Sequence, residues 1–426
     1  MAKKYIVEGG YPLKGRIQPN GNKNAALPII AAALLTDEES IIRNIPDIED
    51  VNIMLQIAEK LGASVSKDDN HTIRIKGTIT KTTIDIDLGK KIRTSILFAG
   101  PIVARCGEVT LPPPGGDVIG RRRLDTHFLA LSGLGCLIEI DTGFKLTANK
   151  LVGKDIFLDE ASVTGTENAV MAAVMAHGKT IISNAASEPH VQDLCKFLNS
   201  MGANITGVGS NILYIEGVEK LHGTDYTIGA DFMEVGSLIG LAAVTRSEIE
   251  IVNADPHNMR MSRLVFGKLG IRWETDGKGI FVPAHQELKV EQDIGGMIPK
   301  IDDAPWPGFP PDLISIIIVT ATQVEGTVLI FEKMFESRMF FIDKLVAMGA
   351  KIVLCDPHRA VISGPSRLRG TELTSPDIRA GMALLTAALC AEGKSIIQNV
   401  IQIERGYENL PDRLKNLGAK IQVVDE

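Results

Sequence analysis

One short phrase recurs six times along the chain and limits its fold more than any other feature. A glycine preceded by a small or apolar residue and followed by a strand-like run stands at Gly62, Gly135, Gly202, Gly270, Gly349 and Gly418. The intervals are nearly even, so that six units of about 71 residues account for the whole chain of 426 residues. One copy is common in α/β proteins, but six copies with the same flanking pattern predict a repeat architecture.

Each unit predicts the same order of elements. An apolar, Ala-rich helix comes first, as in residues 23–35 and 378–390, and a strand follows it. An amphipathic helix such as 51–63 comes next, with apolar residues three and four apart, and a second strand closes the unit. The recurring glycine suits the residue after a helix, because glycine adopts the left-handed conformation without strain.

The first helix of each unit is apolar nearly all round and is therefore expected to be buried, whereas the second should lie at the surface. This pattern predicts an α/β (α+β) fold of two lobes with three repeats in each. Helices would fill the inside of each lobe, and sheets and amphipathic helices would form the outside.

Bulk properties exclude several classes of protein. The net charge is −7, which argues against a nucleic-acid partner held by bulk electrostatics. The longest apolar run, around Leu313–Val319, is far shorter than the ~18 residues of a membrane span, and the N-terminus has no apolar targeting segment. No histidine spacing is typical of a metal site, so we expect no metal. The cysteines form no CxxC pair, and we expect reduced core residues in a cytoplasmic protein at Cys106, Cys136, Cys195, Cys355 and Cys390.

The stretch GGDVIGRRR, residues 115–123, places one acid beside three arginines in the loop before the second amphipathic helix. The same loop is charged in other repeats, and matching loops of a repeat lie on matching rims. Arginine binds phosphate and carboxylate groups through paired hydrogen bonds, so these rims predict a cleft for a small polyanion. The basic residues are Lys23, Arg93, Arg121, Arg122, Arg123, Arg338, Arg379 and Arg405, and the acidic ones are Asp117, Asp125, Glu188, Asp231, Glu234, Asp312, Asp377 and Glu408.

Familiar catalytic motifs are missing from the sequence. There is no GxxxxGK[ST] nucleotide loop, no GxGxxG fingerprint opening a βαβ unit and no GxSxG. Acid–base chemistry on an anionic substrate remains.

Several motifs resemble those of the enolpyruvyl transferases, in particular the branch that acts on a sugar nucleotide. KNAALP and RGYE are the most specific. The resemblance covers the whole chain and includes GNKNAALPI (21–29), RTSILFAGP (93–101), PGGDVIGRRRLDTH (114–127), SVTGTEN (162–168), NAASEP (184–189), GADFMEVG (229–236), FPPDL (309–313), FESRM (335–339), SPDIRAG (375–381) and ERGYE (404–408). It implies an inside-out α/β barrel in each lobe, with lobes of about 23–229 and 1–22 plus 230–426.

The resemblance implies transfer of the enolpyruvyl group of phosphoenolpyruvate to the 3-hydroxyl of UDP-N-acetylglucosamine, with release of phosphate, as the first committed step of peptidoglycan synthesis. It implies no cofactor. The catalytic residues would be Asp117, Lys23, Asp312 as the base near the 3-hydroxyl, and Arg405. Substrate contacts would come from Lys23, Asn24, Arg93, Arg122, Arg123, Leu124, Asp125, Thr126, Ser162, Val163, Asp312, Met334, Arg338 and Asp377.

Asp117 stands where many family members have a cysteine that protonates the methylene carbon of phosphoenolpyruvate. The neighbouring arginines favour the ionised form, whereas a bound anionic substrate and the exclusion of water favour the acid. We expect an aspartic acid that becomes competent only in a closed complex. The resemblance also implies resistance to fosfomycin, which alkylates the cysteine.

Other readings stay open. The same fold and donor serve 3-phosphoshikimate 1-carboxyvinyltransferase, although KNAALP and RGYE favour the sugar-nucleotide branch. Glu160 and Pro311 depart from that branch's pattern and leave a related nucleotide acceptor open. A non-catalytic UDP-sugar-binding paralogue and an RNA-end cyclase with a nucleotidylated histidine are further alternatives. A monomer is expected.

Overall fold

The computed structural model describes residues 3–116 and 123–425, which fall into two compact units. The central unit contains the described residues 21–116 and 123–229, and the C-terminal unit contains residues 3–20 and 230–425. Each has its own hydrophobic core. Among the predicted site residues, Asp117, Arg121 and Arg122 lie outside the described residues.

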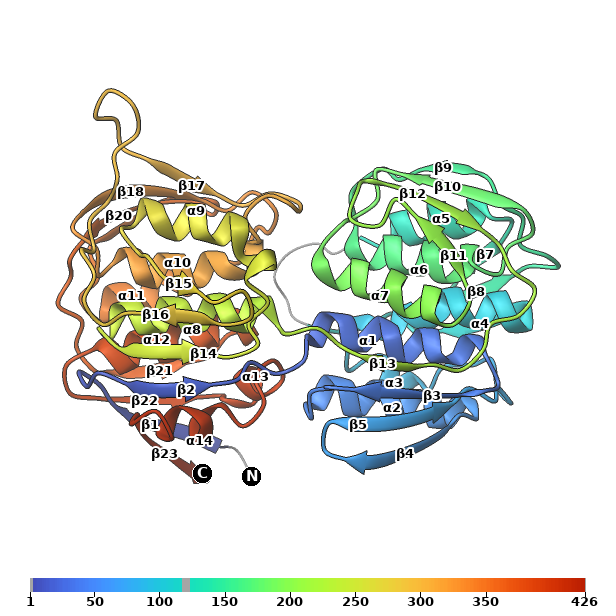
Figure 1. Ribbon diagram of the computed structural model, residues 1–426, viewed down its shortest axis with the longest axis horizontal. Helices are drawn as coiled ribbons and strands as arrows, with labels where there is room; N and C mark the ends of the chain where they lie inside the picture. Colours follow the sequence, from blue (N-terminus) through green and yellow to red (C-terminus); the bar gives the residue numbers. More distant parts are fainter. Residues whose placement is uncertain (1–2, 117–122, 426) are drawn as a thin grey trace. The chain divides into compact units, whose positions relative to one another are not determined.

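The central unit begins with an inner helix and ends with a strand (Figure 1). Its elements, with η for a 3-10 helix, are α1 Lys23–Ala32, η1 Ala33–Leu35, β3 Glu39–Arg43, α2 Glu49–Leu61, β4 Ser64–Asp69, β5 Thr72–Lys76, α3 Ile86–Gly89, η2 Arg93–Phe98, α4 Ala99–Cys106, β6 Glu108–Leu111, α5 Asp125–Gly133, β7 Leu137–Ile140, β8 Phe144–Thr147, β9 Asp155–Phe157, α6 Val163–Ala173, β10 Lys179–Ser183, α7 Pro189–Ser200, β11 Asn204–Thr206, β12 Ile212–Glu216 and β13 Asp225–Thr227.

The C-terminal unit combines the first two strands of the chain with everything after β13. Its elements are β1 Lys3–Glu8, β2 Lys14–Ile17, α8 Phe232–Val244, β14 Glu248–Ile251, η3 Pro256–Met259, α9 Arg260–Lys268, β15 Glu274–Thr275, β16 Ile280–Val282, β17 Lys300–Asp302, η4 Pro311–Leu313, α10 Ile314–Ala321, β18 Gly326–Phe331, α11 Ile342–Ala347, β19 Ile352–Asp356, β20 Arg359–Gly364, β21 Glu372–Thr374, α12 Ile378–Cys390, β22 Lys394–Gln398, α13 Ile401–Glu404, α14 Leu410–Lys415 and β23 Lys420–Asp425.

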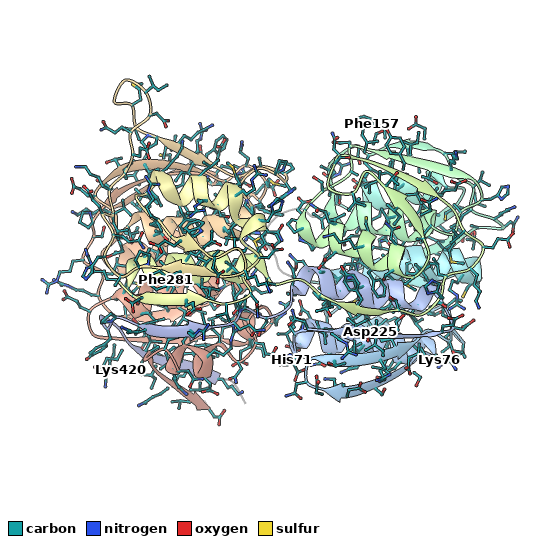
Figure 2. All side chains as sticks on the ribbon, viewed as in Figure 1. His71, Lys76, Phe157, Asp225, Phe281 and Lys420 are labelled. Atoms are coloured by element: carbon teal, nitrogen blue, oxygen red, sulfur yellow. The ribbon has the colours of Figure 1, made fainter. Side chains whose placement is uncertain are left out.

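Six small sheets repeat one topology. In the sheet β9–β10–β12–β11, a short strand pairs in parallel with β10, and the hairpin β11–β12 that follows the outer helix pairs with β10 on its other side. Four other sheets have the same order, and the sixth, β6–β8–β7, has only an isolated bridge, Thr83 to Thr110, in place of the short parallel strand. The outer faces carry exposed side chains, as Figure 2 shows for Phe157, Asp225 and Lys420.

The predicted closing strand is thus wrong for most repeats, which close with a hairpin of two strands. Tight turns with polar residues and glycine make this possible. At the turn between β15 and β16, for example, the Asp276 carboxylate accepts hydrogen bonds from the backbone N–H groups of Lys278 and Gly279.

Strands from distant parts of the chain complete both units. The last repeat has only β23 after its outer helix, and β1 lies antiparallel between β22 and β23 as the missing strand. β2 pairs in parallel with β14, and β13 pairs in parallel with β3. In each unit the three sheets therefore include strands that are far apart in the sequence.

The inner helices are buried, as predicted. Every residue of α8 and α10 is buried, and these helices pack against each other and against α12. Glycines allow the close approach: a Cβ on Gly240 would lie 2.4 Å from Cγ2 of Ile316, and one on Gly236 would lie 2.7 Å from Leu313. The predicted α/β fold of six repeats, three in each unit, is confirmed.

All six recurring glycines have the positive φ expected of residues that end helices, between 76° and 115°. In the second repeat the predicted inner helix begins as the 3-10 helix η2 and becomes α-helical at Ala99. Pro101 then lies in the first turn of α4, where its missing N–H breaks no helical hydrogen bond.

The cysteine prediction is only partly right. Cys136 and Cys195 are buried and Cys390 is half-buried, but Cys106 and Cys355 are exposed; all five are free. Cys106 ends α4, and Cys355 lies on the edge strand β19, so an apolar neighbourhood in the sequence did not bury either thiol. Over the described residues, no helix is both long and apolar enough to cross a membrane.

Candidate active site

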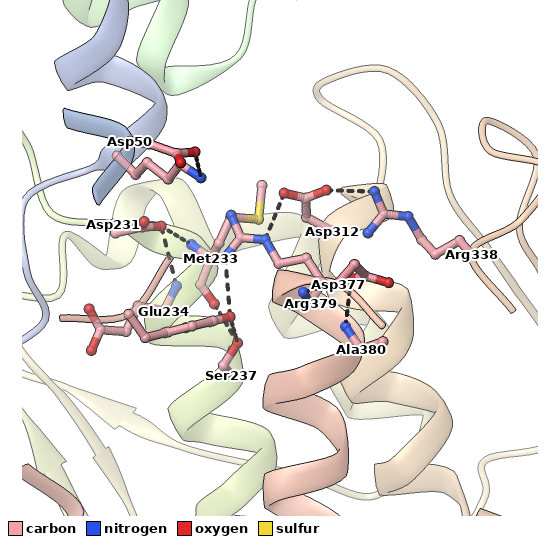
Figure 3. A network of polar contacts seen from close by, with 12 residues as sticks. Asp50, Asp231, Met233, Glu234, Ser237, Asp312, Arg338, Asp377, Arg379 and Ala380 are labelled. Atoms are coloured by element: carbon pink, nitrogen blue, oxygen red, sulfur yellow. Dashed lines mark hydrogen bonds and ion pairs between the residues drawn. The ribbon is translucent and has the colours of Figure 1, made fainter. Parts of the chain in front are cut away.

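Asp312 is the carboxylate around which the C-terminal unit gathers two arginines (Figure 3). It lies in η4, immediately before the inner helix α10. Arg338 donates from Nη2 to Oδ1 over 3.0 Å, and Arg379 donates from Nε to Oδ2 over 2.8 Å. The side chains of Arg338 and Arg379 are only 4% and 8% exposed, whereas that of Asp312 is 23% exposed. Two buried cations thus orient a carboxylate whose own surface stays partly accessible.

A buried hydrogen-bond chain holds Arg379 in place. Its Nη1 donates to the hydroxyl of Tyr407 over 3.1 Å, and this hydroxyl lies 3.0 Å from Oγ of Ser237 on α8. Ser237 in turn donates to the carbonyl of Met233 over 2.8 Å. Burial raises the pKa of Tyr407 although Arg379 opposes the shift, so the hydroxyl is neutral at physiological pH. The chain ties Asp312 to helices α8 and α12.

Two further acids serve as helix caps. Asp377 precedes α12, and its Oδ1 accepts hydrogen bonds from the backbone N–H groups of Arg379 and Ala380 over 2.8 and 2.9 Å. Asp231 caps α8 in the same way, accepting from Met233 and Glu234. Both carboxylates satisfy otherwise unbonded donors at positive helix ends. Asp377 therefore also fixes the start of the helix that carries Arg379.

Arg338 reaches Asp312 from the loop that follows β18. Its guanidinium lies over the ring of Phe335, with 4.7 Å from Cζ to the ring centroid. The same loop exposes Met334, a predicted substrate contact. Arg405, predicted to be catalytic, follows α13 in the same unit, where its Nη1 donates to Oε1 of Gln402 over 2.9 Å.

In the central unit, Lys23 begins the inner helix α1 and forms a nearly buried ion pair with Asp50 on the outer helix α2. The distance from Nζ to Oδ2 is 2.7 Å, and the two side chains are 9% and 7% exposed. Asn22 caps α1 by accepting from the N–H of Ala25. Asn24, half-buried, follows Lys23 in the first turn. The ammonium group is therefore held near the positive end of a helix, a place suited to an anion.

Arg93 and Arg123 flank the described edges of the charged loop. Arg93 donates from Nη2 to the backbone carbonyl of Arg123 over 2.8 Å. Arg123 is exposed and pairs with Asp125 and Asp159. Thr126 donates to the other oxygen of Asp159 over 2.7 Å. These contacts surround the start of α5, where Leu124 is the N-cap residue.

His127 is a structural residue. Its two ring nitrogens lie 3.0 Å from Oγ1 of Thr164 and 2.9 Å from Nδ2 of Asn168. Burial, helped by the charge of Arg93, lowers its pKa to about 3, so the ring is neutral at physiological pH. Thr164 and Asn168 belong to α6, which Ser162 caps by accepting from the N–H of Gly165, and Val163 opens. A fully bonded, buried ring does not suit the nucleotidylated histidine of an RNA-end cyclase.

The structure brings together three predicted residues, Asp312, Arg338 and Asp377, around Arg379, which the sequence analysis placed only among the basic residues of the rims. Predicted residues of the central unit lie at three places: Lys23 with Asn24 at the start of α1, Arg93 with residues 123–126 at the start of α5, and Ser162 with Val163 at the start of α6. Sequence reasoning missed the supporting residues Asp50, Tyr407 and Glu332. The phrase RGYE, quoted above for the family resemblance, contains Tyr407, but the buried hydrogen bond of its hydroxyl is not visible in a sequence. Among the described residues, no cluster of three or more His, Cys, Asp or Glu side chains could hold a metal ion.

Comparisons with known proteins identify relatives that match almost the whole chain. A family profile described as EPSP synthase (3-phosphoshikimate 1-carboxyvinyltransferase) matches residues 7–414. Proteins named UDP-N-acetylglucosamine 1-carboxyvinyltransferase are 64% identical over 424 residues in Treponema denticola and 62% identical over 422 residues in Borreliella burgdorferi. These alignments cover 99% of this chain and 100% and 99% of the relatives.

Solved structures of low sequence identity share the fold. The enolpyruvyl transferase NikO from Streptomyces tendae has a TM-score of 0.87 at 24% identity, with 99% of both chains covered. An EPSP synthase from Acinetobacter baumannii has a TM-score of 0.76 at 16% identity, with both chains fully covered. This confirms the inside-out α/β barrel architecture. The chain therefore belongs to the enolpyruvyl transferase family, and within it to the group of the UDP-N-acetylglucosamine 1-carboxyvinyltransferases.

Proposed function

We propose that the protein transfers the enolpyruvyl group of phosphoenolpyruvate to the 3-hydroxyl of UDP-N-acetylglucosamine and releases phosphate, the first committed step of peptidoglycan synthesis. The observation that carries the proposal is the 64% identity to a full-length relative of that name. The arrangement around Asp312 supports it, because acid–base chemistry on a hydroxyl needs an oriented carboxylate.

Asp312 is suited to accept a proton from the sugar hydroxyl. Arg338 donates to Oδ1 and Arg379 donates to Oδ2, so the carboxylate is oriented through both of its oxygens. A carboxylate held on both oxygens cannot rotate freely, so it loses little entropy when the substrate binds. Pro311 restricts the backbone directly before it, at a position where a short helix tolerates proline.

The remaining roles follow the family resemblance. Asp117 would protonate the methylene carbon of phosphoenolpyruvate while the sugar oxygen attacks its neighbour. Return of that proton would expel phosphate and restore the double bond. Lys23, Arg122 and Arg405 would bind the phosphate and carboxylate groups, Arg93 would lie near the phosphates, and Asn24 and Asp377 would contact the sugar. The uridine end would lie against residues 122–126 with Ser162 and Val163, and Met334 would contact substrate.

The test is phosphate release from phosphoenolpyruvate, with UDP-N-acetylglucosamine or shikimate 3-phosphate as acceptor. We expect release only with the UDP-sugar, and a loss of at least about a hundredfold in kcat for Asp117→Asn. Asp141→Asn, which removes an exposed carboxylate from the turn between β7 and β8, is the control and should keep full activity.

Three outcomes would count against the proposal. Release with shikimate 3-phosphate would favour the other branch of the family. Tight binding of the UDP-sugar in calorimetry without release of phosphate would favour a non-catalytic binder. Full activity of Asp117→Asn would remove that residue from the mechanism. Fosfomycin resistance, a monomeric state and a cytoplasmic location stay predictions.

A further inference from the structure

Two carboxyl groups lie side by side in the interior of the C-terminal unit. Asp303 and Glu332 both have side chains with no exposure to solvent. They directly follow the paired strands β17 and β18, in which Asp302 lies opposite Phe331. Asp303 and Glu332, the residues that follow this pair, therefore lie next to each other at the base of the loop that carries Met334, Phe335 and Arg338.

Each carboxyl group uses one oxygen to shape that loop. Oδ1 of Asp303 accepts from the N–H of Lys333 over 2.5 Å, and Oε1 of Glu332 accepts from the N–H groups of Met334 and Phe335 over 3.1 and 3.0 Å. These bonds fix the turn that presents the Phe335 ring to the guanidinium of Arg338. The pair therefore supports the arginine that holds Asp312.

The other two oxygens lack a hydrogen-bond donor among the described residues: Oδ2 of Asp303 and Oε2 of Glu332. Nε of Arg338 is 3.8 Å from Oε2, too far for a hydrogen bond. Two ionised carboxylates would leave both oxygens unsatisfied and would repel each other. One proton between them supplies the missing donor and removes one charge.

Charge balance leads to the same count of protons. Two buried carboxyl groups, those of Asp303 and Glu332, lie beside one guanidinium group, that of Arg338, which also pairs with Asp312. Buried charges without a partner are costly, so this single cation can balance at most one ionised carboxyl group of the pair. Burial raises the pKa of Glu332 to about 8, Arg338 opposes this shift, and the charge of Asp303 and its hydrogen bond add to it.

Other charged groups near the pair are engaged elsewhere. His358 places Nδ1 2.8 Å from the backbone carbonyl of Glu332 rather than its carboxyl group. Lys333 and Lys300 pair with Asp302 over 2.6 and 2.9 Å. Of the described side chains, Arg338 is the cation that faces the pair.

We propose that Asp303 and Glu332 share one proton and thereby hold the 333–338 loop so that Arg338 contacts Asp312, which makes them positioning residues for the sugar-nucleotide acceptor. The proposal rests on the proposed function of Asp312. Loss of the shared proton would add a negative charge 3.8 Å from Nε of Arg338 and draw its guanidinium away from Asp312.

The first test uses stability. The folded protein keeps a proton that the unfolded chain releases above pH ~4.5, so this pair lowers stability as the pH rises from about 4.5 to about 8. Asp303→Asn and Glu332→Gln each replace the shared proton with an amide N–H and keep one negative charge. In urea unfolding, both variants should therefore lack this part of the decline of unfolding free energy with pH. Asp302→Asn, which removes the neighbouring carboxylate, should keep it. If both amide variants showed the wild-type slope of unfolding free energy against pH, the proposal would be overturned.

The second test uses catalysis and Arg338 itself. Wild-type kcat/KM for UDP-N-acetylglucosamine should fall about tenfold per pH unit above pH 8, and the amide variants should lack this decline. The Nε–H signal of Arg338 in nitrogen-15 NMR should shift over the same range in the wild type only. Identical profiles in wild type and variants would refute the positioning role. If the wild type releases no phosphate at any pH, the proposed function fails, and the NMR and stability data still decide the proton sharing and the Arg338 contact.

Discussion

Lys23 and Asp50 form a nearly buried ion pair, in which each charge compensates the other. Leaving one buried charge without the other costs about 3 kcal/mol of unfolding free energy, so we expect that loss from Lys23→Met and from Asp50→Leu. The double variant has no buried charge at this site and should lose much less than the sum. A double-mutant cycle in urea measures the coupling. Additive losses would mean that the 2.7 Å contact contributes nothing specific.

At the same scale, the sequence identified residue types better than it identified partners. Asp312 and Arg338 were predicted site residues, and they do meet, but Arg379 lies 67 residues from Asp312 and no local pattern joins them. The pairing of Asp303 with Glu332 was missed for the same reason, because these two residues are also distant in the sequence. Cys355 shows a related failure, because it lies on an edge strand whose three central side chains are all exposed. The roles of Asp117 and Arg122 stay predictions.

At the scale of the elements, substitution of the glycines that follow helices tests whether the recurring glycine is needed for its left-handed backbone conformation. Gly418 has a φ of 99° and no atom within 4 Å of an added Cβ, so Gly418→Ala should cost about 1 kcal/mol through the left-handed conformation alone. Gly418→Asn should cost less, because asparagine tolerates that conformation. Gly62→Ala should cost more, since its Cβ would lie 2.8 Å from the Thr78 carbonyl oxygen. Urea midpoints give the order, and equal losses at both sites would contradict it.

Periodicity explains why the helices and first strands could be predicted. The largely apolar sequences of α8 and α10 match their burial on all sides, whereas the outer helix α2 keeps a polar face. The hairpins were missed because their strands are short and half-exposed, so their alternation is weak. β15 has two residues, and β4 and β7 carry mostly exposed side chains.

For the whole molecule, the position of β1 makes the first residues of the chain part of the last sheet. β1 lies between β22 and β23, so its side chains are packed by residues almost four hundred positions away. A sequence pattern alone shows a strand there but not its neighbours; the assignment of this strand to the C-terminal lobe came from the family resemblance. Each unit has its own core, and damage to one sheet should therefore affect one unit first.

Val7→Asp tests this consequence directly. Val7 is fully buried and lies opposite Ser395 and Ile421, so a carboxylate there would lack both solvent and a partner, at a cost of roughly 4 kcal/mol. Limited proteolysis should then cleave within residues 230–425 at urea concentrations that leave residues 21–229 protected. Ile6→Asp, on the opposite and half-buried face of the same strand, adds the same charge and should cost much less. Simultaneous loss of protection in both units would show instead that they unfold as one, and the closure of the last sheet by β1 would then stabilise the entire chain.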